Sequence, residues 1–347
     1  MRSASTVVRG TTKTFGLVTA AAIAVTGFGA GTANAAVVSG VLDCAPTALQ
    51  TADGRVPGFA VPDGKMAKDR PQDIPTVAEM AAMEAEFAKR LSALSFDPTE
   101  VDIKDPININ VYVHVIREDG TVEGGNIPRT WIRAQVKVLN HAFRGHGEAE
   151  PGARTPFKFE LGGPDGLENG VQRITNADWY FNAADESVEM EMKSATRIGS
   201  ADDLNLWTTG ITESTGILGY ATFPDGYDSN PDRDGVVIDA HTMPGGDLVP
   251  YHLGDTGTHE VGHWLGLYHT FEGGCTAPGD LVEDTPYEAE PFFGECSGGP
   301  RDSCAGDPGD DPIENFMDYS DDVCMDRFTV GQRDRSLEQW FAYRDGN

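Results

Sequence analysis

Three histidines and one glutamate lie within the eleven-residue segment His259-Glu-Val-Gly-His-Trp-Leu-Gly-Leu-Tyr-His269. Residues four apart share one face of a helix, so His259 and His263 can direct ring nitrogens at one metal ion. Glu260 lies beside His259 and can reach a water on that metal without being a ligand. Gly266 accepts the left-handed conformation that ends a helix, and the reversed chain brings His269 back. Three ligands leave one tetrahedral position open, which is typical of catalytic rather than structural zinc.

The extended motif is much rarer than His-Glu-x-x-His alone, so a buried helix with incidental histidines is the weaker interpretation. The motif resembles that of the metzincin metalloproteases, which also need a methionine-containing turn beneath the zinc. Asn315-Phe-Met-Asp-Tyr-Ser320 provides such a turn, and its sequence resembles the pappalysin family, the ulilysin-like branch of the metzincins. The resemblance covers roughly residues 105–335. It implies an α/β (α+β) metzincin fold, with a twisted mixed sheet, an edge strand over the cleft, the zinc helix and a loop-rich C-terminal subdomain.

The residues around this motif suggest a hydrolytic mechanism. Zinc lowers the pKa of its water towards about 7, and Glu260 would take the proton and return it to the leaving amine. By resemblance, Tyr319 would donate a hydrogen bond to the oxyanion; a packed aromatic is the alternative. Met317 would shape the floor of the site, because a thioether is a poor ligand for this ion. In metzincins the segment of Asp321 and Asp322 lines the pocket after the scissile bond, which implies a preference for Arg or Lys there.

The N-terminus has the pattern of a secretory signal. Residues 1–35 carry three basic residues, then the apolar stretch Phe15–Phe28, then Ala33-Asn34-Ala35 as a cleavage site. A membrane anchor is the alternative, but the stretch is short and is interrupted by Thr and Gly. We therefore expect a secreted, extracellular protein.

The chain is strongly acidic. Its formal net charge is -29, and loss of the signal removes three basic and no acidic residues, which gives -32. Such a surface repels nucleic acid and anionic membranes and attracts basic peptides and divalent cations. The expected partners are therefore protein or peptide substrates.

Residues 36–104 differ in composition from the remainder of the chain. They are rich in Pro, Gly and Asp up to Pro75, and Val77–Leu91 then has a strong helix pattern. We interpret them as a propeptide, followed by a catalytic domain at 105–347 whose N-terminal subdomain ends at about residue 266. Cys44 is the one cysteine of this segment. Its thiolate could occupy the open zinc position in a zymogen; a bystander thiol is the alternative.

Strand and helix patterns alternate from Pro106 onward, as expected for an α/β sheet. Gly216–Pro224 is apolar, contains glycine and ends in proline, as suits a sheet edge. By resemblance, the free backbone groups of this edge strand would pair with an extended substrate; an ordinary interior strand is the alternative. Ser187–Ser194 is ambiguous. The other predicted elements are strands at 107–116, 157–161, 171–174 and 236–240, a helix from 127 to about 143, and a sheet segment at 203–211.

Four cysteines, Cys275, Cys296, Cys304 and Cys324, follow the zinc motif in a region with little regular pattern. Disulfides suit such a region in an exported protein, and four cysteines allow three pairings. The resemblance favours Cys275 with Cys304 and Cys296 with Cys324. A second zinc cluster is the alternative, but no Cys-x-x-Cys is present.

The loop after Cys275 offers oxygen ligands. Asp280, Glu283 and Asp284 lie among turn residues, and oxygen-rich loops of this kind bind calcium. The family is known to hold calcium here; a solvated acidic loop is the alternative.

Taken together, these features predict a secreted zinc-dependent endopeptidase made as a zymogen. The alternatives are a zinc amidase acting on small or cell-wall amides, which an open cleft with an edge strand disfavours, and an inactive metal-binding or adhesion module, which the intact Glu260 disfavours. The remaining histidines are scattered and are interpreted as structural: His114, His141, His146, His241 and His252.

Overall fold

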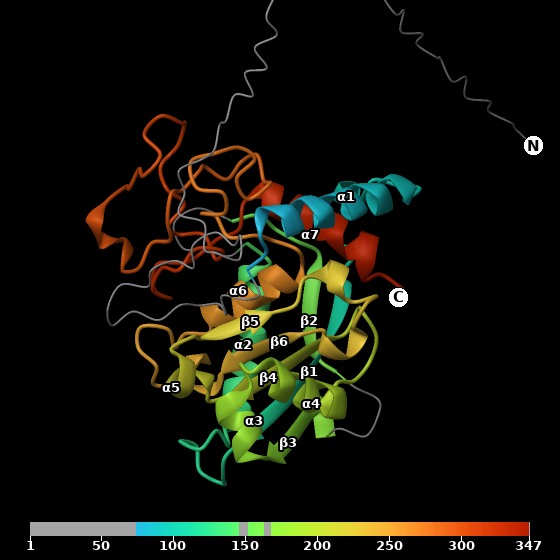
Figure 1. The fold of residues 1–347 in the computed structure, drawn as a ribbon, viewed down its shortest axis with the longest axis vertical. Helices are drawn as coiled ribbons and strands as arrows, with labels where there is room; N and C mark the ends of the chain where they lie inside the picture. Colours follow the sequence, from blue (N-terminus) through green and yellow to red (C-terminus); the bar gives the residue numbers. More distant parts are fainter. Residues whose placement is uncertain (1–73, 146–151, 163–167, 347) are drawn as a thin grey trace, which may run out of the picture. The chain divides into compact units, whose positions relative to one another are not determined.

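The computed structural model describes residues 74–145, 152–162 and 168–346, which all belong to one unit of the chain (Figure 1). The predicted signal segment, Cys44 and His146 lie outside the described residues. Within the described ranges, no helix is both long and apolar enough to cross a membrane.

The predicted elements are present, with small shifts at their ends. The ambiguous segment Ser187–Ser194 lies within a helix. The helices are α1 (Val77–Ala93), α2 (Arg129–Ala142), α3 (Ala177–Asn182), α4 (Glu186–Thr196), α5 (Ile211–Thr215), α6 (Asp255–Trp264) and α7 (Val330–Tyr343). The strands are β1 (Ile107–Arg117), β2 (Phe157–Leu161), β3 (Val171–Thr175), β4 (Leu204–Thr209), β5 (Gly219–Ala221) and β6 (Val236–Asp239).

One mixed sheet organises these elements. Its strand order is β2-β1-β4-β6-β5, with β3 also paired to β1. The pairs formed by β1, β2, β3, β4 and β6 are parallel, whereas β5 runs antiparallel to β6, with Gly219 opposite Ile238. The segment 216–224 therefore contains an edge strand, as predicted.

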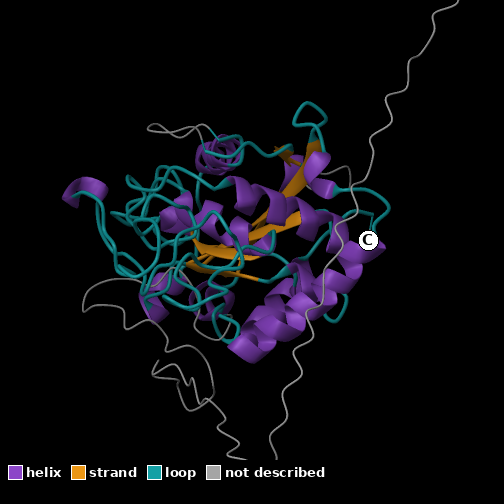
Figure 2. Ribbon diagram, turned by 90° about the horizontal axis from the view of Figure 1, so that it is seen from above, coloured by secondary structure: helices purple, strands orange, loops and turns teal. Residues whose placement is uncertain are grey.

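The sheet buries a different core on each face, because successive strand residues point to opposite sides. Helices α2, α6 and α7 contribute to the first core, and α3, α4 and α5 to the second. Figure 2 shows the strands lying among the helices. The strand residues in the first core are Ile109, Val111, Val113, Val115, Phe157, Phe159, Leu204, Leu206, Ala221, Val236 and Ile238; Ile116, Trp207, Tyr220 and Val237 belong to the second.

The chain between α6 and α7 is built mainly of loops and turns. Two disulfides cross-link it, Cys275–Cys304 and Cys296–Cys324, which is the pairing that the resemblance favours. Cross-links suit a loop-rich region, because they limit the conformations open to its unfolded state.

Candidate active site

Helix α6 carries the first two histidines and lies against the strands at the sheet edge. All ten of its residues are buried, and it contacts β5 and β6. It ends in a Schellman motif, in which Gly266 N–H donates to His263 O (2.8 Å) and Leu267 N–H donates to Gly262 O (3.0 Å). Gly266 has a φ of +87°, which favours glycine, so the predicted helix stop is present.

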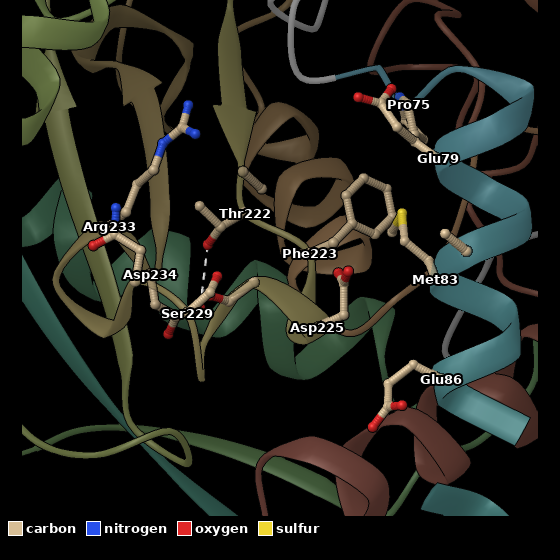
Figure 3. A pocket seen from close by; sticks show the side chains of 14 residues that line it. Pro75, Glu79, Met83, Glu86, Thr222, Phe223, Asp225, Ser229, Arg233 and Asp234 are labelled. Atoms are coloured by element: carbon tan, nitrogen blue, oxygen red, sulfur yellow. Dashed lines mark hydrogen bonds between the residues drawn. The ribbon is translucent and has the colours of Figure 1, made fainter. Parts of the chain in front are cut away.

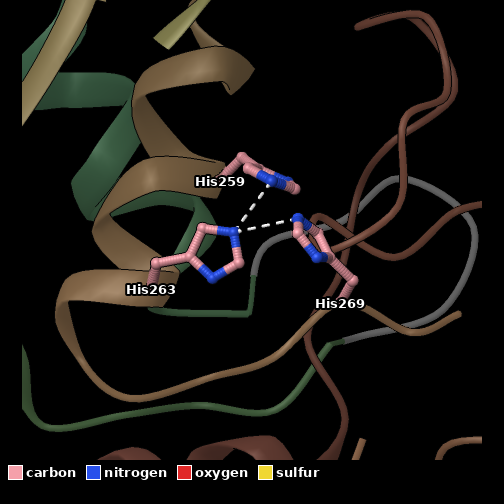
Figure 4. Close-up of side chains that lie close together, drawn as sticks. All are labelled: His259, His263 and His269. Carbon is pink, nitrogen blue, oxygen red and sulfur yellow. Dashed lines mark hydrogen bonds between the residues drawn. The ribbon is translucent and has the colours of Figure 1, made fainter. Parts of the chain in front are cut away.

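The turn after Gly266 brings the three imidazoles together, as Figure 4 shows. His263 Nε2 lies 3.2 Å from His259 Nε2 and 3.1 Å from His269 Nε2. A tetrahedral zinc ion with Zn–N bonds of about 2.0–2.1 Å separates its ligand nitrogens by about 3.3 Å. The three side chains are also buried, at 0, 4 and 3% exposure. This donor set fits a zinc ion.

The second nitrogen of each ring fixes the ring's orientation. His259 Nδ1 lies 2.6 Å from Phe316 O, and His263 Nδ1 lies 2.7 Å from Leu267 O. His269 Nδ1 lies 3.2 Å from a carboxylate oxygen of Glu272. Each of these oxygens accepts, so each Nδ1 donates its hydrogen there and each Nε2 faces the other two rings, where its lone pair can bind a metal. The three lone pairs converge on one point.

The sequence did not reveal these orienting groups. Two of the three are main-chain carbonyls, at Phe316 and Leu267, and a carbonyl has no residue type to recognise. Glu272 lies three residues after His269, a spacing that allows the two side chains to meet. That spacing alone does not distinguish Glu272 from the other acidic residues of the loop.

Glu260 lies beside the edge strand. It is fully buried, and a Cβ added at Gly219 of β5 would come within 2.8 Å of Glu260 Oε1 and 2.9 Å of Val237 O. Only glycine at position 219 leaves room for this carboxylate. The zinc helix and the edge strand therefore meet at Glu260.

Met317 and Tyr319 lie under and beside the histidines. A Cβ at Gly262 would collide first with Met317 Sδ, so the methionine packs directly against α6. The ring of Tyr319 lies 5.7 Å from the ring of His259 and 5.4 Å from that of His269. The methionine turn thus positions His259 through Phe316 O and places an aromatic ring against two imidazoles.

Asp321 and Asp322 are buried, and Asp322 has an evident structural task. Its Oδ2 accepts amide hydrogens from Leu253 (2.7 Å), Gly254 (3.2 Å) and Asp255 (3.4 Å). The N-cap residue of helix α6 is Gly254, which has no side chain to cap the helix, and Asp322 accepts these N–H groups from the methionine-turn side.

The three acidic residues suggested for calcium have different environments. Asp280 is buried, whereas Glu283 and Asp284 are exposed. Asp284 accepts the N–H of Gly331 (2.9 Å) in the first turn of α7, where a carboxylate favours the helix dipole. Across the described ranges, the three active-site histidines are the one group of His, Cys, Asp and Glu side chains whose ligand atoms converge closely enough for a metal.

Comparisons with known proteins identify relatives of this chain. The model of the peptidase M43 family, described as pregnancy-associated plasma protein-A, matches residues 202–340. An extracellular metalloprotease of Verticillium alfalfae is 46% identical over 242 residues, which cover 69% of this chain and 77% of that protein. An extracellular metalloprotease of Sordaria macrospora is 41% identical over 303 residues, which cover 86% of this chain and 94% of that protein.

Solved structures show the same relationship. Mature mirolysin of Tannerella forsythia, in complex with a cleaved peptide, is 30% identical with a TM-score of 0.56, covering 67% of this chain and 90% of that chain. A promirolysin variant of Tannerella forsythia is 26% identical with a TM-score of 0.64, and the match covers 79% of this chain and 92% of that chain. The chain belongs to the pappalysin family of metzincins and is a metalloendopeptidase, so the amidase and inactive-module alternatives are set aside.

Proposed function

We propose that this protein is a secreted, zinc-dependent endopeptidase made as a zymogen. The observation that carries the proposal is the convergence of the Nε2 atoms of His259, His263 and His269 beside Glu260. Secretion is supported by the signal-like N-terminus and by the names of the relatives, which are extracellular metalloproteases.

The residues divide the chemistry between them. Zinc held by the three imidazoles would supply Lewis acidity, which activates water and polarises a carbonyl. Glu260 takes the proton from the attacking water and delivers it to the leaving amine nitrogen. The hydroxyl of Tyr319 donates a hydrogen bond to the oxygen that gains negative charge. The outer edge of β5 pairs with the extended substrate backbone and holds the scissile bond over Glu260.

Zinc removal tests the assignment directly. We expect casein hydrolysis by the processed protein to stop when a chelator removes zinc and to return on addition of stoichiometric zinc. The metal content of each sample is measured alongside activity. Hydrolysis that persists in metal-free protein would refute a zinc mechanism.

One comparison supports the zymogen proposal. The promirolysin variant covers more of this chain than mature mirolysin does, 79% against 67%. We therefore retain 36–104 as the prosegment, with Cys44 as the candidate zinc-blocking thiol.

A preference for Arg or Lys after the scissile bond is the proposed specificity. Asp321 and Asp322 are two buried carboxylates next to the methionine turn. Burial raises the pKa of Tyr251, and the negative charges of Asp321 and Asp322 raise it further, which indicates a negative potential here. Such a site attracts a cationic side chain.

Matched peptides test this specificity. We expect kcat/KM for a peptide with Arg at that position to exceed that for Gln by about tenfold or more, and Asp321→Asn to reduce the ratio. Asp326→Asn is the control, because Asp326 is paired with Arg327. A ratio near one in the unsubstituted enzyme would contradict the idea. Asp322 is less suited to this test because it also caps α6.

Calcium binding near Asp280 is also proposed, since a buried carboxylate in an acidic loop suits a hard cation. Burial raises the pKa of Asp280 from 3.8 to about 7. Because the pKa of Asp280 is higher in the folded state than in the unfolded state, the stability of the calcium-free protein falls as the pH rises towards 7. Above pH 7 the buried carboxyl group is ionised, and its unfavourable effect on folding is largest.

Bound calcium would remove that disadvantage, so its effect should grow with pH. We expect chelation of calcium, with zinc retained, to lower the unfolding midpoint by about 5 °C at pH 8 and by less at pH 5.5. Asp280→Asn should remove this pH dependence. Equal midpoints with and without calcium at pH 8 would argue against the site.

A further inference from the structure

Helix α1 of the prosegment packs against α7 and the zinc-binding loop. Glu84 of α1 forms a bidentate ion pair with Arg335 of α7, with Nη2–Oε1 and Nη1–Oε2 distances of 2.5 and 3.3 Å. The same carboxylate accepts the hydroxyl hydrogen of Tyr268 (3.2 Å), the residue that precedes zinc ligand His269. One acidic side chain of the helix therefore contacts both α7 and the loop that supplies the third histidine.

Two further contacts extend this interface along the helix. Phe87 is buried and stacks on Tyr343, with ring centroids 6.4 Å apart. Arg90 pairs with Asp228 at 2.5 Å and lies over the same Tyr343 ring at 4.6 Å. We call the receiving residues the helix-docking surface: Tyr268, Arg335, Tyr343 and Asp228.

The docking surface is connected to the active site through the main chain. Arg335 Nε also donates to Gly266 O (2.9 Å), at the glycine that ends the zinc helix. Beside the interface, Met83 and Glu79 of α1 face Phe223 and Asp225 across a cavity of about 710 Å³ (Figure 3). The ring of Phe223, just past the edge strand, lies 5.3 Å from the ring of His263.

Helix α1 has the features of a unit that forms on its own. Its 17 residues are rich in Ala and Glu, and Thr76 and Glu79 form a complete capping box, with bonds of 2.7 and 3.2 Å. A helix that is already favoured loses less entropy on binding. The connector after it is open to a protease, because residues 102–106 are exposed.

We propose that the helix-docking surface binds residues 77–93 as a separable partner, which stays bound after the connector is cut. This inference rests on the proposed division of the chain into prosegment and catalytic unit. The charge pair of Glu84 with Arg335 and the stacking of Phe87 on Tyr343 provide the recognition, and both are independent of the Cys44 thiol.

The full chain with a specific protease site inserted between Lys104 and Asp105 tests the proposal, in a Cys44→Ser background that removes any thiol contribution. After the cut, we expect the two fragments to co-elute in size-exclusion chromatography at micromolar concentration and to separate on dilution. Glu84→Gln and Phe87→Ala should each raise the dissociation constant at least tenfold.

Lys89→Gln is the control. It also removes one charge from the same helix, but Lys89 is exposed and its hydrogen bonds run to Glu86 within α1. Circular dichroism before the cut shows whether each variant is folded. Fragments that separate at micromolar concentration without substitution, or equal effects of Glu84→Gln and Lys89→Gln, would overturn the proposal. Because co-elution needs no catalysis, it holds or fails independently of the peptidase assay.

Discussion

Replacing Glu260 with glutamine is expected to lower kcat/KM for peptide hydrolysis by about 10²- to 10⁴-fold, the usual contribution of a general base. Glutamine has nearly the same shape and fits the space between α6 and Gly219, but its amide cannot accept the proton of water. Because Glu260 is not a ligand in this arrangement, the three histidines remain in place. Zinc content and the unfolding midpoint should therefore change little.

Single-turnover cleavage of a fluorogenic peptide, with zinc quantified in the same samples, measures this effect. Glu272→Gln is an informative comparison, since Glu272 accepts from His269 Nδ1. That variant should weaken zinc binding about 10- to 100-fold, whereas Glu260→Gln should not. A Glu260→Gln enzyme with more than a tenth of the original activity would remove Glu260 from the proton transfer.

Replacing Arg344 with methionine is expected to destabilise the protein by about 3–5 kcal/mol, the usual cost of breaking a buried ion pair by removing one partner. Arg344 is fully buried and forms hydrogen bonds to Asp234 at 3.1 and 3.2 Å. It also donates to Trp264 O (2.9 Å), and its guanidinium lies 3.7 Å from the centre of the Trp264 ring. The end of α7 thus holds the last residue of the zinc helix.

Asp234 extends the same network to the edge strand. It accepts from Trp264 Nε1 (3.2 Å) and from the hydroxyl of Thr222, which follows β5 (3.1 Å). One carboxylate therefore connects α6, α7 and the end of β5. Loss of Arg344 should loosen the zinc helix and the substrate edge together.

Denaturant unfolding of the zinc-loaded protein measures the loss. Arg333→Met, on the same helix, is the control, because Arg333 is partly exposed and pairs with the adjacent Asp334, and it should cost no more than about 1 kcal/mol. The double variant Asp234→Asn and Arg344→Met should be more stable than the sum of the two single changes predicts, because both single changes break the same ion pair. Equal losses for Arg333→Met and Arg344→Met would contradict this account.

Much of the fold could be predicted from local pattern. Helix α1 and strand β1 begin at the predicted residues, and the edge position of β5 followed from the glycines and proline around it. The segment 187–194 could not be assigned, because its alternating Glu and Met suits a strand as well as a helix. Asp185 decides it locally, as its side chain accepts from Ser187 and Val188 N–H at the start of α4.

Residue type and spacing by themselves indicated the candidate zinc ligands, the candidate base and the methionine turn, because these act through side chains within one short segment or one recognisable motif. Only the tertiary structure decided what holds them. The carbonyls of Phe316 and Leu267, the cap from Asp322 and the pairing of Asp234 with Arg344 all depend on which distant segments meet. Carbonyl groups are identical at every residue, and an acidic side chain looks the same in a sequence whether it pairs across 110 residues or faces solvent.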